Sequence, residues 1–191
     1  MLRFTAAAAL AAATLAAAPA HAQDCTIEGD HWDLDDAGVG ALYDCMSQAM
    51  IDGYTAEGDE TAAAYRGWTA TATRPAVAGP HGERFLMTFA NDVAAEQYLA
   101  FEQGAFEMPV GSVLAKESIT NSKGTAKVGP LFIMEKVADA PDTDGWLYSG
   151  VQPNGKELKI SQAFCHDCHG AFEESDSMGY PLEEVRVSAT N

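Results

Sequence analysis

A short run near the end of the chain, Phe164-Cys165-His166-Asp167-Cys168-His169-Gly170, holds residue types that bind metals and form thioethers. Cys165 and Cys168 have a spacing that places both thiols on one side of a helical turn. Thiols so placed can add to the vinyl groups along one edge of a porphyrin, and the imidazole of the next residue, His169, can bind its iron. The C-x-x-C-H pattern therefore predicts one covalently attached c-type haem, with His169 as an axial ligand.

Two other chemistries use the same residue types. A structural zinc site normally draws ligands from a second cluster, and the histidines His31 and His81 are scattered along the chain. A thioredoxin-like redox pair needs a preceding strand in a βαβ setting, which does not suit a motif so near the C-terminus. The motif therefore favours haem over both zinc and thiol redox chemistry.

The position of the motif bears on the second axial ligand of the iron. Only 22 residues follow His169, and Met178 is the one methionine among them. A methionine so close behind the haem helix has difficulty reaching the opposite face of the porphyrin. The sequence thus favours a five-coordinate iron with an open side, which suits catalysis or gas binding better than electron relay.

The N-terminus has the form of a cleaved secretory signal. Residues 1–22 carry one positive charge at Arg3, an Ala- and Leu-rich run and a small-residue cleavage pattern. A membrane anchor is the structural alternative, but Thr14 and Pro19 interrupt the run. We expect an exported, periplasmic protein in which residues 23–191 form one haem domain, with no membrane insertion once the signal is removed.

The formal net charge of −17 repels phosphate backbones and anionic lipids, so nucleic acid is not an expected partner. The charge suits either a basic redox partner or simple solubility.

Cys25 and Cys45 lie outside the haem motif. In an oxidising compartment they can form a disulfide that ties the N-terminal segment to the first helix, with two unpaired thiols as the alternative.

The hydrophobic spacing predicts an α+β fold in which an antiparallel sheet packs with helices and a C-terminal helix bears the haem. The predicted helices are Leu34–Tyr54, Glu60–Trp68, Asn91 or Asp92 to about Gln103, and the cysteine-bearing segment. The predicted strands are Glu83–Ala90, Ser112–Thr120, Ala126–Val137 and Gly145–Val151, and Thr69–Gly82 is predicted to be a loop.

The stretches PHGERFLMTFAND, PVGSVLAKES, GPLFIMEKV and GWLYSGV, followed by C-x-x-C-H and SDSMGYP, resemble the cytochrome P-460 family, which includes the cytochromes c′-β. The likeness runs from about Tyr65 to Pro181. Four-helix cytochromes c′ also carry a late C-x-x-C-H motif, but the strand-rich middle of this chain argues against them.

This resemblance implies oxidation of hydroxylamine or related nitrogen oxides, with Lys116 cross-linked to the haem macrocycle. It also implies a carboxylate that takes protons from the substrate. Asp176 fits the family's acidic position best, and Glu173 and Glu174 are the other candidates.

A pocket lined by aromatics such as Phe85, Phe89 or Phe132 would instead imply a cytochrome c′-β that binds nitric oxide without turnover, and an electron carrier is the third possibility. Arg84 and Arg66 are candidates for pairing with the haem propionates. The expected partners are a small nitrogen-containing ligand or substrate and a redox partner cytochrome, and the family suggests a homodimer.

Overall fold

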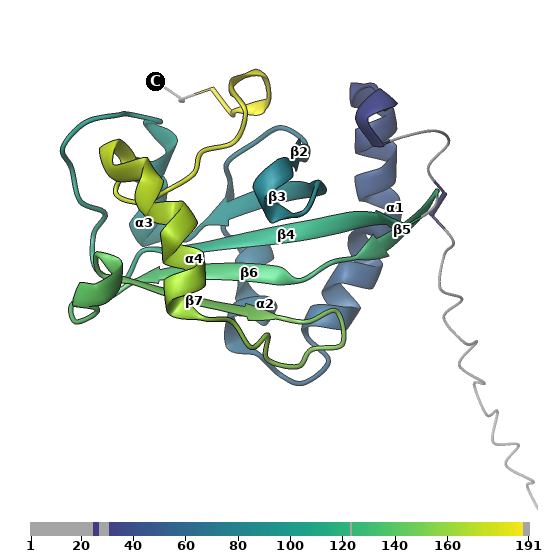
Figure 1. Ribbon diagram of the computed structural model, residues 1–191. Helices are drawn as coiled ribbons and strands as arrows, with labels where there is room; N and C mark the ends of the chain where they lie inside the picture. The colour runs from purple at the N-terminus through teal and green to yellow at the C-terminus, as the bar shows by residue number, and fades with distance from the viewer. Residues whose placement is uncertain (1–24, 27–30, 123, 189–191) are drawn as a thin grey trace, which may run out of the picture.

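The computed structural model describes residues 25–26, 31–122 and 124–188, and its centre is a seven-stranded antiparallel sheet with helices on both faces (Figure 1). This arrangement confirms the predicted α+β class. The predicted signal, residues 1–22, lies outside the described residues. No helix in the described ranges is both long enough and apolar enough to cross a membrane.

The sheet has the strand order β1-β3-β4-β6-β7, with β2 paired to β3 and β5 paired to β4. The strands are β1 (Thr69–Ala70), β2 (Ala76–Ala78), β3 (Arg84–Ala90), β4 (Val113–Ser122), β5 (Thr125–Val128), β6 (Leu131–Lys136) and β7 (Trp146–Val151).

Within the described ranges four α-helices flank the sheet, and each begins at a side chain that accepts a hydrogen bond from a backbone N–H of the first turn. Such caps satisfy N–H groups that have no partner within the helix. The helices and their caps are α1 (Asp36–Tyr54, capped by Asp35), α2 (Glu60–Ala64, Asp59), α3 (Asp92–Leu99, Asn91) and α4 (Gln162–His169, Ser161).

Two apolar cores lie on the two faces of the sheet. One core packs α1 and α2 against Phe85, Met87 and Phe89 of β3. The other contains Trp146 and Tyr148 of β7 together with residues of α3. In Figure 1, α4 crosses one face of the sheet while α1 and α2 lie behind the other. Because successive side chains of a strand point to opposite faces, each central strand serves both cores.

Two segments of the sheet differ from the prediction. The strand predicted over Ala126–Val137 is divided into β5 and β6 at Gly129-Pro130, because proline has no N–H to continue the ladder. The loop predicted over Thr69–Gly82 contains β1, β2 and a 3₁₀ turn, Gly79–His81. These short strands pair with the edge of β3, a tertiary contact that local sequence does not encode.

The predicted disulfide between Cys25 and Cys45 is confirmed, with Cα atoms 6.0 Å apart. Cys25 also accepts a backbone hydrogen bond from Ala126, and Thr26 bridges to Thr125 of β5. The disulfide therefore joins the segment before α1 to the middle of that helix, at the end of the sheet that carries β5.

Candidate functional site

A cavity of about 640 Å³ lies between the sheet and α4. Its floor is formed by β3, β4 and β6, and α4 forms the opposite wall. The 3₁₀ turn Gly79–His81 and the segment Gly179–Val185 contribute to the remaining walls. This volume falls within the range of about 300–1,000 Å³ that is typical of ligand sites.

Helix α4 brings the three residues of the haem motif to this cavity. Cys165, Cys168 and His169 all line it, and both thiols are free. Burial raises the pKa of the Cys165 thiol, whereas Cys168 is exposed. One turn of helix thus presents two free thiols and an imidazole to one space, as covalent haem attachment requires.

The ring of His169 is oriented by a backbone hydrogen bond. Its Nδ1 lies 2.9 Å from the carbonyl oxygen of Ser177. A carbonyl can only accept, so the proton is on Nδ1, and Nε2 keeps a lone pair for a metal. Burial also lowers the pKa of His169, which favours the neutral, metal-binding form.

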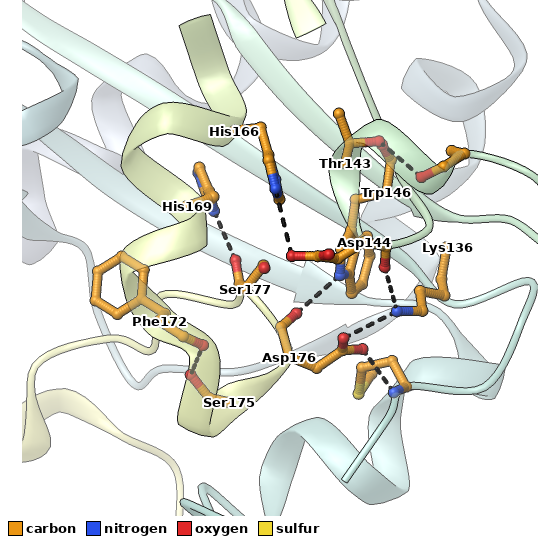
Figure 2. A network of polar contacts seen from close by, with 12 residues as sticks. Lys136, Thr143, Asp144, Trp146, His166, His169, Phe172, Ser175, Asp176 and Ser177 are labelled. Carbon is orange, nitrogen blue, oxygen red and sulfur yellow. Dashed lines mark hydrogen bonds and ion pairs between the residues drawn. The ribbon is translucent and has the colours of Figure 1, made fainter. Parts of the chain in front are cut away.

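A buried polar network holds the loop that carries Ser177 (Figure 2). Lys136 Nζ donates to Asp176 Oδ1 at 2.9 Å and to the carbonyl oxygen of Asp144 at 2.7 Å. Asp176 Oδ2 accepts from the backbone N–H of Met108 at 2.7 Å, and its carbonyl oxygen accepts from Trp146 Nε1 at 2.8 Å. Both carboxylate oxygens and the carbonyl oxygen of Asp176 therefore have hydrogen-bond partners within the protein.

The carboxylate predicted to take protons from substrate is therefore placed in a structural network. Asp176 is not among the residues that line the cavity, and its backbone, at φ 49°, begins the turn that presents Ser177 to His169. Glu173 and Glu174 are exposed and also lie outside the cavity lining. In the part of the chain that the structure describes, no carboxylate lines the cavity.

Lys116 lies on the cavity floor, in the middle of β4. It pairs with Thr88 of β3 and Phe132 of β6, and all three side chains line the cavity. Burial lowers the pKa of Lys116 to about 8. The structure thus brings Lys116 into the same space as the thiols and imidazole of α4.

The neighbouring residue Glu117 points to the other face of the sheet. It accepts a hydrogen bond from Tyr43 at 2.7 Å and another from Tyr65, and it forms an ion pair with Arg66. Burial and the nearby carboxylate raise the pKa of both tyrosines. Arg66 is therefore committed to Glu117, away from the cavity where a haem propionate would need it.

Arg84, the other candidate for pairing with a haem propionate, lines the cavity. Its Nη1 donates to the carbonyl oxygen of His81, and its buried Nε has no hydrogen-bond partner within the described residues. An unpaired guanidinium N–H of this kind suits an anionic group of a bound ligand. Of the three phenylalanines considered for the pocket, only Phe132 lines it, because Phe85 and Phe89 face the α1 core.

The structure adds His81, which sequence reasoning treated as an isolated histidine. Its ring lines the cavity, 4.8 Å from Phe132 and 6.3 Å from His169 between ring centres. Burial first, then the charges of Lys116, His169 and Arg84, lower its pKa to about 3, so the ring is neutral. The sequence signal was its place in a Gly-Pro-His-Gly turn directly before a strand.

These residues fit a haem. The cavity is large and mostly apolar, the two thiols are unpaired, His169 has its Nε2 available, and Arg84 offers a spare donor. No group of three or more His, Cys, Asp or Glu side chains suited to a metal ion occurs in residues 25–26, 31–122 and 124–188.

Comparison with known proteins agrees with this site. A family model described as Cytochrome P460 matches residues 62–178, a span that runs from α2 through Lys116, α4 and the loop of Asp176. A search of curated proteins gave no match. The matched span covers more than half of the chain and includes every cavity residue of the C-x-x-C-H motif. The chain therefore belongs to the cytochrome P460 family and is a haem-binding cytochrome.

Proposed function

We propose that this protein is an exported, periplasmic c-type cytochrome whose single haem is attached to Cys165 and Cys168, and that it oxidises hydroxylamine or a related nitrogen oxide. The observation that supports this proposal is the position of Lys116, in the same cavity as Cys165, Cys168 and His169. When bound, the haem supplies an iron that binds small nitrogen compounds and accepts their electrons. A redox partner cytochrome then receives those electrons.

The chain's own residues position the group. The two thiols fix one edge of the macrocycle to α4, and the Ser177 carbonyl holds His169 with Nε2 free. The unpaired Nε of Arg84 would offer a hydrogen-bond donor to a propionate. The apolar wall formed by residues such as Leu86, Leu114 and Phe132 excludes bulk water from the cavity.

Lys116 is the residue that would distinguish an enzyme of this family from a simple haem protein. The lowered pKa leaves part of its amine neutral near pH 8, and therefore nucleophilic. A bond from Nζ to a macrocycle carbon would remove one hydrogen from each partner. It is thus a two-electron oxidation, for which hydrogen peroxide is a sufficient oxidant because it is reduced to two waters.

A second function is binding of nitric oxide without turnover. It is favoured by the lack of a lining carboxylate among the described residues and by the place of Phe132 beside Lys116. An apolar pocket with no proton acceptor of that kind suits a diatomic gas better than a substrate that must lose protons.

The two functions give different spectra. The protein should be matured with a c-type haem attachment system and compared with Lys116→Ala and with the exposed strand lysine variant Lys127→Ala as a control. A strongly red-shifted ferrous Soret band in the wild type and Lys127→Ala, absent in Lys116→Ala, together with hydroxylamine oxidation, supports the enzyme.

An ordinary haem c spectrum with nitric oxide binding and no hydroxylamine oxidation would support the gas-binding function instead. A mature chain that carries no covalent haem by mass spectrometry would overturn both functions.

A further inference from the structure

His81 and His169 face the same cavity from two different parts of the fold. His169 belongs to α4, whereas His81 ends the 3₁₀ turn that follows β2. Their ring centres are 6.3 Å apart and their ring planes make an angle of 79°. This separation can be compared with the one that a shared metal would impose.

A bond from an imidazole nitrogen to a first-row transition metal is about 2.0 Å long, and the ring centre lies about 1.1 Å behind that nitrogen. Two imidazoles that bind one metal from opposite sides therefore have ring centres about 6.2 Å apart. A distal histidine that only donates a hydrogen bond to an iron-bound ligand stands farther away, because the ligand occupies the space between. The observed 6.3 Å matches direct binding by both rings.

The turn that carries His81 is held in place by its neighbours. Gly82 donates its N–H to the carbonyl oxygen of Gly79 at 2.9 Å, and Arg84 Nη1 donates to the carbonyl oxygen of His81. Gly82 has a φ of 75°, a backbone conformation that favours glycine, and a Cβ at this position would lie 2.8 Å from Arg84 Nη1. The turn is also anchored to the sheet, because β2 pairs with β3.

The ring itself has a fixed neighbour. Phe132 of β6 packs edge-on against His81, with ring centres 4.8 Å apart. Phe132 is paired with Lys116 in the sheet, so its own position is set by the strand register. The backbone and the ring of His81 are thus both positioned before any ligand enters.

Other polar side chains near His169 are less suited to this place. Tyr148, whose ring centre is 5.3 Å from that of His169, has its hydroxyl 3.1 Å from His166 Nδ1. His166 in turn lies 3.3 Å from Asp144 through Nε2, and it does not line the cavity. Lys116 is the remaining alternative, because its side chain lines the same cavity.

We propose that His81 is the second axial ligand of the haem iron in the resting protein, opposite His169. This inference rests on the proposed haem attachment and deepens it: a small nitrogen ligand reaches the iron only after His81 has dissociated. The His81 imidazole then competes with external ligands for the iron. The resting iron is six-coordinate, in place of the open five-coordinate iron that the sequence favours.

The test uses the matured holoprotein. The ferric wild type should give a low-spin electronic and EPR spectrum, and His81→Ala should give a high-spin one. Adding free imidazole to His81→Ala should restore the low-spin spectrum. His166→Gln, which changes a histidine of the haem helix outside the cavity, is the matched control and should stay low-spin.

Ligand kinetics provide a second readout. If His81 is bound at least nine-tenths of the time, its removal tightens carbon monoxide or nitric oxide binding by a factor of about ten or more. The observed association rate should also reach a plateau with ligand concentration in the wild type, where His81 release limits it, and rise linearly in His81→Ala.

A covalent haem with a high-spin ferric spectrum in the wild type would overturn this proposal and leave the proposed function standing. A low-spin spectrum that survives in His81→Ala but is lost in Lys116→Ala would also overturn it, because lysine would then be the ligand. Absence of covalent haem would overturn both, and mass spectrometry of the same sample separates that case.

Discussion

The substitution Asp176→Asn separates a structural role of this carboxylate from a role in catalysis. Asp176 and Lys136 form an ion pair whose side chains are 7% and 8% exposed. Asparagine keeps the shape of the side chain but removes its charge and one of its two acceptor oxygens. Lys136 Nζ or the Met108 N–H then loses a partner, and the lysine charge stays buried without a counter-charge.

Removing one partner of a buried ion pair costs about 3–5 kcal/mol. We take about 3 kcal/mol here, because Lys136 keeps its hydrogen bond to the Asp144 carbonyl. In a chain of this size that loss lowers the melting temperature by about 6–12 °C. Thermal unfolding of the holoprotein, followed by circular dichroism, measures it.

Two further variants complete the experiment. Lys136→Met combined with Asp176→Asn removes both charges and should recover part of the lost stability, because no unpaired charge remains. Glu173→Gln, an exposed acid in the same segment, should stay within about 0.5 kcal/mol of the wild type. An Asp176→Asn protein that keeps full stability and its haem but loses hydroxylamine oxidation would refute the structural role.

Three other perturbations test separate parts of the molecule. Because the lowered pKa of Lys116 is about 8, its neutral amine fraction rises about tenfold between pH 7 and pH 9. In protein matured without the bond, the rate of peroxide-driven cross-linking should therefore rise by the same factor, and the Soret band measures it. Replacing Cys25 and Cys45 together by serine opens a loop with a sequence separation of 20 and should cost about 3 kcal/mol in guanidinium unfolding. Glu117→Gln leaves Arg66 without its buried counter-charge, so it should lower the free energy of unfolding by about 3 kcal/mol without moving the haem spectrum, since it lies on the other face of the sheet.

Local sequence signals were sufficient for most elements of the fold. The starts of α1 and α3 lie within two residues of the predicted ones, and a capping side chain such as Asn91 acts within the first turn of its own helix. Strand β3 follows from its apolar residues. The end of α3 was placed too late, at Gln103 instead of Leu99, since the chain turns left-handed at Phe101, with φ 48°, which composition does not reveal.

The residues of the site also fall into those that local sequence predicts and those that it does not. The haem motif is local, so Cys165, Cys168 and His169 could be read from one stretch of sequence, and Lys116 came from the family resemblance. In β3 an apolar run does not show which residues face the cavity, and Phe85 and Phe89 were proposed for it although they face α1. His81 was missed because its proximity to His169 depends on how β2 pairs with β3.

The alternation of Lys116 and Glu117 along β4 has a consequence for how the strand can align. A shift of one residue against β3 or β6 would turn the carboxylate toward the haem space and bury the amine among Tyr43, Tyr65 and Arg66. Lys116 would then face Arg66, and the hydroxyls of Tyr43 and Tyr65 would lose the carboxylate that accepts their hydrogen bonds. The contacts of Glu117 with Tyr43, Tyr65 and Arg66 therefore help to fix the register of β4. We expect single-residue insertions in β4 to destabilise the fold even at positions that do not line the cavity.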